Sequence, residues 1–306
     1  MSQFAERIAA EFPLRCKQQE KENMRTYLVG QFKALGYPAK VQSGRGSSAN
    51  VVVGDAENAR VLVTAHYDTP RRDIFPSLIC PTRPESYILY QALTPVLLVL
   101  AAFVLSVGLT FVVNKPALTL PLFIALLLFA MVYFSYGPAD TRTMNNSTSA
   151  VAALLETASV LTPRHRSKVA FVFFDGSGGA REFRKKYPSS REKTVIHVDC
   201  VGSGDEILFL PSKYSRWNDE VLSAILESFK DVEKPEEKSV YLKTDGLVYY
   251  PGENRHFRYS IAVCACNKVK GFGRCILPTR GDNRVEEENL RILRDGLAKL
   301  IACFDN

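Results

Sequence analysis

Several short polar segments of this 306-residue chain carry the residue types that bind metal ions or move protons in enzymes. Histidine and carboxylate side chains serve as zinc ligands and as general acids or bases. Each segment directly follows or precedes an apolar run; the segments are His66-Tyr67-Asp68, Asn145-Asn146-Ser147-Thr148, Asp175-Gly176-Ser177-Gly178-Gly179 and His197-Val198-Asp199. Function in parallel sheets gathers at the carboxyl ends of the strands, so these segments predict a site at one sheet edge.

The apolar runs have the lengths and order of an α/β domain. Central strands are expected at residues 61–65, 169–174, 195–199 and 260–264, and a further strand at 50–54. Helices are expected within residues 1–38 and at residues 149–161, 218–229 and 286–304. This alternation predicts a mostly parallel central sheet flanked by helices. The apolar fraction of 46% excludes a wholly disordered chain, and seven cysteines in this length exclude a disulfide scaffold.

The middle of the chain has a different composition. Residues 87–113 and 117–136 contain no charged residue, and each run is long enough to cross a bilayer as a helix. Only three residues separate the runs, which predicts a transmembrane hairpin over residues 86–138. Residues 1–85 and 139–306 then form one discontinuous domain. A pair of buried core helices is the alternative.

The charges beside the two runs predict their orientation. The turn carries only Lys115, whereas the outer flanks carry four arginines, namely Arg71, Arg72, Arg83 and Arg142. The positive-inside rule places both soluble arms in the cytoplasm. The first residues lack the apolar segment of a signal peptide, and cysteines that we expect to be unpaired suit a reducing compartment.

Five segments in this order resemble the co-catalytic zinc aminopeptidase family, which includes bacterial leucyl aminopeptidases, glutaminyl cyclases and the transferrin receptor ectodomain. The segments are AHYDTP (65–70), NNSTSAVAALLE (145–156), VAFVFFDG (169–176), VDCVGSGD (198–205) and LPTRGDNRVEEENL (277–290). The resemblance covers residues 10–80 and 140–303, everything except the hairpin. It implies the fold of that family. It also implies zinc as the only candidate cofactor, with His66 and Asp199 as remaining metal ligands and Asp68 orienting His66.

Other positions depart from the family pattern. Asn146 stands where the family has its bridging aspartate, and a neutral amide bridges two dications poorly. Ser177 and Gly178 lie where the family has a glutamate pair, one of which is the general base. Pro278 stands at the final histidine and has no ligating side chain, and Glu182 lies too far along the chain to replace the missing glutamates. The resemblance therefore implies a catalytically inactive member of the fold.

Two interpretations of the remaining polar residues stay open. His66 and Asp199 could form a rearranged single-metal site with Asp68, Asp175 or His197, because alternate residues on a strand share a face. Alternatively, these residues form an inherited hydrogen-bonded cluster at the strand ends, with His197 as a core histidine.

Other motifs carry weaker signals. Ser177 does not fit the nucleophile-elbow pattern Gly-x-Ser-x-Gly, and a flexible turn that replaces a lost ligand loop is the preferred interpretation of this stretch. The glycines also lack the lysine of a phosphate-binding loop. The Cys264-x-Cys266 spacing, with Cys275 beyond, predicts buried strand cysteines rather than a metal knuckle.

The expected function follows from these inferences. A membrane-anchored, inactive peptidase-like protein would bind peptides or a protein partner, or act as a scaffold. The enzymatic alternative is a residual metallopeptidase with a rebuilt site at His66 and Asp199. The net charge of +7 includes the basic runs 164–168 and 181–186, which could face anionic lipid or form a solvated surface. No nucleic-acid-binding module is evident.

Overall fold

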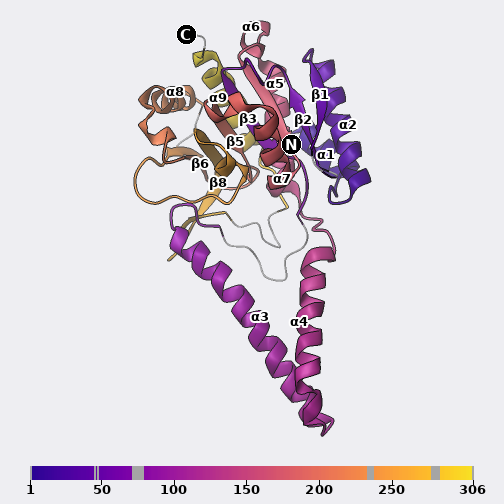
Figure 1. Cartoon of the computed structure of the whole chain (residues 1–306). Helices are drawn as coiled ribbons and strands as arrows, with labels where there is room; N and C mark the ends of the chain where they lie inside the picture. Colours follow the sequence, from indigo (N-terminus) through magenta and orange to yellow (C-terminus); the bar gives the residue numbers. More distant parts are fainter. Residues whose placement is uncertain are drawn as a thin grey trace.

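The computed structural model describes residues 2–44, 46, 48–70, 79–232, 238–276 and 283–304. Within these residues one nine-stranded sheet forms the centre of the molecule (Figure 1), in the order β1-β2-β4-β3-β5-β8-β6-β7 with β9 paired to β8. The strands are β1 (Ala39–Ser43), β2 (Ala49–Val53), β3 (Val61–His66), β4 (Val169–Phe174), β5 (Thr194–Val198), β6 (Glu206–Pro211), β7 (Ser239–Leu242), β8 (Ser260–Val269) and β9 (Gly273–Cys275).

The four central strands β4, β3, β5 and β8 run parallel to one another. Their side chains are almost wholly buried, which explains why their sequences are continuous apolar runs. Because β3, β4 and β5 point the same way, the polar segments that follow them emerge at the same edge of the sheet. The outer strands β2 and β6 pair antiparallel with the central strands β4 and β8.

Helices cover both faces of the sheet. Alternate residues of β3 separate the two layers: Val61 and Val63 face one apolar core, whereas Leu62 faces another. The first core is formed with α1 (Gln3–Glu11), α2 (Gln18–Ala34), α5 (Ser149–Val160), α8 (Asp219–Lys230) and α9 (Glu287–Cys303). The second is formed with α7 (Gly176–Lys186). The expected α/β fold is therefore confirmed.

Short helical segments complete the connections. They are α6 (Pro163–Arg166), η1 (Pro116–Leu118), η2 (Met144–Thr148), η3 (Pro188–Arg191), η4 (Ser215–Trp217) and η5 (Glu253–His256). The Thr148 side chain at the N-cap position of α5 makes no capping hydrogen bond. The Asn145 carboxamide oxygen instead accepts hydrogen bonds from the backbone of Gly202 and Ser203, which ties the start of α5 to the loop after β5.

The glycine-rich stretch after β4 is helical, so the expectation of a flexible turn there is wrong. Helix α7 begins at Gly176, whose φ of +56° favours glycine. A Cβ atom at Gly176 would lie 3.1 Å from Asp68 Oδ2, and one at Gly179 would lie 2.2 Å from Asn50 Oδ1. The glycines therefore let α7 pack closely against the end of β3 and against β2.

Two long apolar helices, α3 (Pro84–Val112) and α4 (Thr119–Tyr136), project away from the α/β domain and meet at their far ends (Figure 1). By length and composition each could cross a membrane. Only 17% of the apolar window of α3 and none of that of α4 is buried, so the alternative of core helices does not describe them. Near the turn, the Thr110 and Thr119 hydroxyl oxygens lie 2.9 Å apart in a hydrogen bond.

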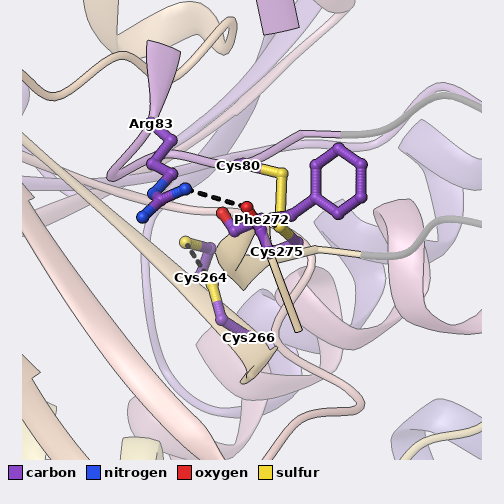
Figure 2. Close-up of a disulfide and its surroundings, with 7 residues drawn as sticks. Cys80, Arg83, Cys264, Cys266, Phe272 and Cys275 are labelled. Atoms are coloured by element: carbon purple, nitrogen blue, oxygen red, sulfur yellow. Dashed lines mark hydrogen bonds between the residues drawn. A yellow bond between two sulfur atoms is a disulfide. The ribbon is translucent and has the colours of Figure 1, made fainter. Parts of the chain in front are cut away.

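The segment that leads into α3 is bonded covalently to the edge of the sheet. Cys80 and Cys275 form a buried disulfide with a Cα–Cα distance of 4.1 Å (Figure 2). Beside it, the Ile276 amide donates a 2.7 Å hydrogen bond to the Ile79 carbonyl. The expectation that all cysteines are unpaired is therefore wrong for this pair. Cys264 and Cys266 are buried on β8, as expected.

Candidate functional site

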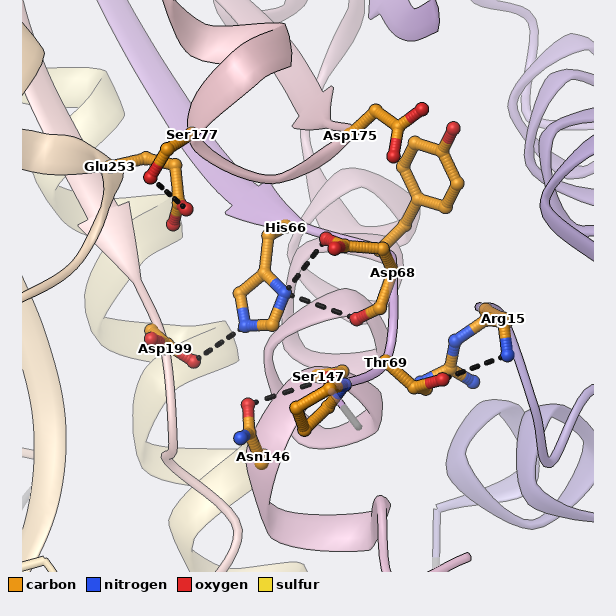
Figure 3. Close-up of polar contacts among 12 residues, drawn as sticks. Arg15, His66, Asp68, Thr69, Asn146, Ser147, Asp175, Ser177, Asp199 and Glu253 are labelled. Carbon is orange, nitrogen blue, oxygen red and sulfur yellow. Dashed lines mark hydrogen bonds and ion pairs between the residues drawn. The ribbon is translucent and has the colours of Figure 1, made fainter. Parts of the chain in front are cut away.

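His66 lies at the centre of the candidate site, at the end of β3 (Figure 3). Its Nδ1 atom lies 3.3 Å from the Asp68 carboxylate and 3.2 Å from the Asp68 carbonyl oxygen. Its Nε2 atom lies 3.1 Å from Asp199 Oδ1. Burial alone would lower the pKa of His66, but the carboxylates of Asp199 and Asp68 outweigh burial and raise this pKa well above 6.5. The imidazolium form is therefore favoured.

Asp199 follows β5 and is bonded through both carboxylate oxygens. Oδ1 faces His66, and Oδ2 accepts a 2.6 Å hydrogen bond from the Tyr250 hydroxyl. Burial would raise the pKa of Asp199, but the charge and hydrogen bond of His66 lower it far below 3.8. Asp199 is therefore a fully ionised carboxylate with its lone pairs directed at two protein groups.

Glu253 was not found from the sequence. It lies in η5, and its Oε1 accepts a 3.2 Å hydrogen bond from the Ser177 hydroxyl (Figure 3). Its Oε2 lies 3.3 Å from His197 Nε2, within ion-pair distance but outside hydrogen-bond geometry. Burial would raise the pKa of Glu253, but the neighbouring histidines outweigh it and lower this pKa to about 2. Nothing in the sequence around Glu253 signals a site, because no strand ends there.

These residues line one pocket of about 300 Å³. Five of the residues singled out from the sequence contribute to it, namely His66, Asp68, Asn146, Ser177 and Asp199. Gly178 does not line it, and Pro278 lies outside the described residues. Ile79, next to the disulfide, and Tyr250 form part of the wall.

Other candidate residues lie elsewhere or serve as structural contacts. Asp175 points away from His66 (Figure 3) and instead pairs with Lys21 Nζ at 2.5 Å. Glu182 pairs with Lys185 on the surface of α7. His197 is fully buried, and its Nδ1 lies 3.0 Å from the Thr64 hydroxyl, as expected for a core histidine.

A buried arginine holds the loop that follows His66. The Arg15 amide donates a 2.8 Å hydrogen bond to the Thr69 hydroxyl (Figure 3). The Arg15 guanidinium donates a 3.0 Å hydrogen bond to the Thr148 hydroxyl. Burial lowers the pKa of Arg15 to about 10. Arg15 thereby joins the loop after β3, which carries Asp68 and Thr69, to the η2 segment before α5, which carries Asn146.

The donor set does not fit zinc. Structural and catalytic zinc ions require at least three protein ligands. No group of three or more His, Cys, Asp or Glu side chains that could hold a metal occurs in the described part of the chain. The two expected ligands are bonded directly to each other, and the nearby Asn146 carboxamide oxygen accepts a 3.4 Å hydrogen bond from Ser147. The His66–Asp199 pair is therefore satisfied without a cation.

Comparisons with known proteins support the fold. Residues 133–259 match the model of peptidase family M28. No curated protein matches the chain. A Zn-dependent exopeptidase from Parabacteroides distasonis aligns with a TM-score of 0.60 and 14% identity, over 98% of this chain and 97% of that chain. Porphyromonas gingivalis glutaminyl cyclase aligns with a TM-score of 0.59 and 12% identity, over 98% and 95% of the two chains.

A third structure is a leucine aminopeptidase precursor from Bacteroides thetaiotaomicron, with a TM-score of 0.56 and 13% identity over 97% and 94% of the two chains. At such identities the structures establish a shared fold. The family match adds a sequence signature over residues that include Asn146, Ser177, Asp199 and Glu253. The resemblance to the zinc aminopeptidase family is therefore confirmed: the chain has the fold of these exopeptidases and cyclases and carries the sequence pattern of peptidase family M28 over residues 133–259.

Proposed function

We propose that this chain is a membrane-anchored peptidase-like protein that binds peptides through their amino termini and does not hydrolyse them. The observation that carries the proposal is the direct contact between His66 and Asp199, which occupies the two remaining ligand positions with an ion pair. Zinc would have to break this pair and would find too few further donors among the described residues.

Glu253, the one glutamate in the described lining of the site, is poorly suited to act as a general base. A general base works best when its pKa lies near the working pH. The pKa of Glu253 is lowered to about 2, so its carboxylate is a weak proton acceptor at neutral pH. Ser177, which stands in the stretch of the missing glutamates, donates a hydrogen bond to Glu253, and a serine hydroxyl is not basic enough to replace a glutamate as general base.

The charge of the pocket favours a cationic ligand. Asp68, Asp199 and Glu253 line it, and its described lining includes no lysine or arginine. The single imidazolium of His66 offsets one of these three carboxylates, so a net negative charge remains. An ammonium group has the charge and the hydrogen-bond donors to match it. The free amino terminus of a peptide is such a group. The free amino terminus of an extended protein partner could bind in the same way.

The membrane anchor is the second part of the proposal. Helices α3 and α4 have the length and composition to cross a bilayer, and their apolar side chains are largely exposed. We place both soluble arms in the cytoplasm on the basis of the arginine bias. Of the four arginines on the outer flanks, Arg71 and Arg72 lie outside the described residues. Extraction of membranes with alkaline carbonate tests the anchor, because an integral protein stays in the pellet and a peripheral one is released.

Peptide binding is tested with matched peptides that have free or acetylated amino termini. The protein in mild detergent should bind the free peptides about tenfold more tightly, and Glu253→Gln should remove most of this difference. Glu227→Gln is the control, because Glu227 is an exposed carboxylate on α8, away from the pocket. Equal binding of acetylated peptides would contradict the proposal. Peptide hydrolysis that His66→Ala abolishes would establish the residual metallopeptidase instead.

A further inference from the structure

A second pocket, of about 420 Å³, lies on the other side of Tyr250 from the candidate site. Tyr250 lines both pockets, and its hydroxyl is bonded to Asp199 on the side of the first. The second pocket is formed by residues 210–214 at the end of β6, by Arg184 of α7, and by residues 248–250, 254–258 and 260. None of the proposed functional side chains other than Tyr250 lines it.

The charge of this second pocket is opposite to that of the first. Four cationic side chains line it, namely Arg184, Lys213, Arg255 and Arg258, and no aspartate or glutamate is among its described lining residues. None of these four cations forms an ion pair within the described residues. Like charges that share one concave surface repel each other and attract anions. The pocket is therefore a cationic concavity without a protein counter-ion.

The polar atoms in its wall are incompletely satisfied. Arg184 donates a 3.0 Å hydrogen bond to the His256 carbonyl oxygen, but its Nε is buried and has no partner among the described residues. His256 Nε2 and the Ser260 hydroxyl oxygen are likewise buried without a hydrogen-bond partner among the described residues. Burying a polar group without a hydrogen-bond partner destabilises a protein, and a ligand with acceptor oxygens could supply the missing partners. Burial and the nearby Arg255 lower the pKa of His256, which is a further sign of a positive potential.

Aromatic rings position one of the cations and add an apolar wall. The Arg258 guanidinium lies 4.7 Å from the Tyr214 ring centre and 5.2 Å from that of Tyr259. Such cation–π contacts hold a guanidinium without neutralising its charge. Tyr214 and Tyr249 are 49% and 38% exposed, so the rims of the pocket can pack against the organic part of a ligand.

We propose that this pocket binds the phosphate group of an organic phosphate monoester. A phosphate monoester carries nearly two negative charges and three acceptor oxygens at neutral pH, which match several converging cations better than one carboxylate does. Arginine guanidinium groups bind phosphate oxygens in a bidentate manner. The organic part would lie against the tyrosine rings. This inference concerns a separate pocket and does not depend on the proposed peptide binding.

Calorimetric titration of the full chain in mild detergent tests the site, with phenyl phosphate and benzoate as probes. The pocket variants are Arg184→Gln combined with Arg258→Gln, and Arg258→Gln alone. The single variant guards against misfolding, because the Arg258 side chain is exposed and its guanidinium packs on the Tyr214 and Tyr259 rings. The matched control is Lys186→Gln combined with Lys230→Gln, which removes the same charge from exposed positions outside the pocket.

Phenyl phosphate should bind the wild type about tenfold more tightly than benzoate does, and the double pocket variant should bind it about tenfold more weakly. The single variant should lose part of the affinity, and the control should retain it. Equal losses in the pocket and control variants, or an absence of saturable binding to the wild type, would overturn the site. Benzoate binding as tight as that of phenyl phosphate would overturn the assignment to a dianion.

Discussion

His66 Nε2 and Asp199 Oδ1 lie 3.1 Å apart at the ends of two adjacent parallel strands, and the described residues contain no group of three or more His, Cys, Asp or Glu side chains that could hold a metal ion. In the family that this chain resembles, the matching residues bind zinc. Here they neutralise each other, and Tyr250 satisfies the second oxygen of Asp199. The account of an inactive peptidase fold rests on this pair.

The stability of the domain should depend on both members of the pair. Asp199→Asn removes the closer of the two carboxylates that pair with the buried imidazolium of His66 and should lower the free energy of unfolding by about 3–5 kcal/mol. The double variant His66→Gln, Asp199→Asn should lose less than the sum of the two single variants, because two neutral groups can still bond each other. Denaturant unfolding in detergent measures the free energy of unfolding of the two single variants and the double variant. If the loss in the double variant equals the sum of the two single losses, His66 and Asp199 are not coupled.

The contribution of the pair should depend on pH. Because folding raises the pKa of His66, the contribution of His66 to the free energy of unfolding is complete below pH 6.5, the pKa in the unfolded chain. This contribution is lost as the pH rises through the pKa in the folded protein. Because folding lowers the pKa of Asp199, the contribution of Asp199 to the free energy of unfolding is complete above pH 3.8, the pKa in the unfolded chain. This contribution is lost as the pH falls through the pKa in the folded protein. The Tm difference between the wild type and His66→Gln should therefore be largest between these two values and shrink in alkali. A difference that grows in alkali would contradict the assignment.

Two helix glycines should respond in opposite directions to alanine. Alanine is favoured over glycine in a helix by about 0.5–1 kcal/mol. At Gly30 of α2 a new Cβ would meet nothing within 4 Å, so Gly30→Ala should stabilise the domain by about that amount. At Gly296 of α9 the Cβ would lie 2.2 Å from the Phe229 ring of α8, so Gly296→Ala should destabilise it. Thermal unfolding of both variants checks the packing of α8 on α9.

The state of Cys80 and Cys275 in cells should report the orientation of the protein. Disulfides persist in oxidising compartments and are rare in the cytosol. In the structure Cys80 and Cys275 are joined by a disulfide. If the arms are cytoplasmic, as we propose, this bond should be reduced in cells, and both thiols should be alkylated when the cells are opened in the presence of a thiol reagent. Cys80→Ser serves as the control for the modified mass. A pair that resists alkylation until a reductant is added would place the domain on the opposite side of the membrane.

The central strands, and the sheet edge that carries the site, could be predicted because strands buried on both faces have continuous apolar sequences. Val169–Phe174 is apolar at every position, as a central parallel strand must be. His66 and Asp199 could likewise be paired, since parallel strand ends meet. Glu253 could not, because it lies in the short helix η5, which only tertiary packing brings to the site. The sequence did not predict the helical start of α7, because glycine has a low helix propensity. The glycines are required there because Asp68 and Asn50 lie too close for a larger side chain, and helix propensity carries no information about such tertiary contacts.

Zinc content tests the central claim most directly. The full chain would be purified in mild detergent, dialysed against zinc and counted for metal per chain by elemental mass spectrometry, beside a His66→Ala, Asp199→Ala double variant. The account predicts zinc far below one ion per chain and equal in both proteins. A stoichiometry near one that disappears in the double variant would contradict it and would show that these two residues hold a rebuilt metal site.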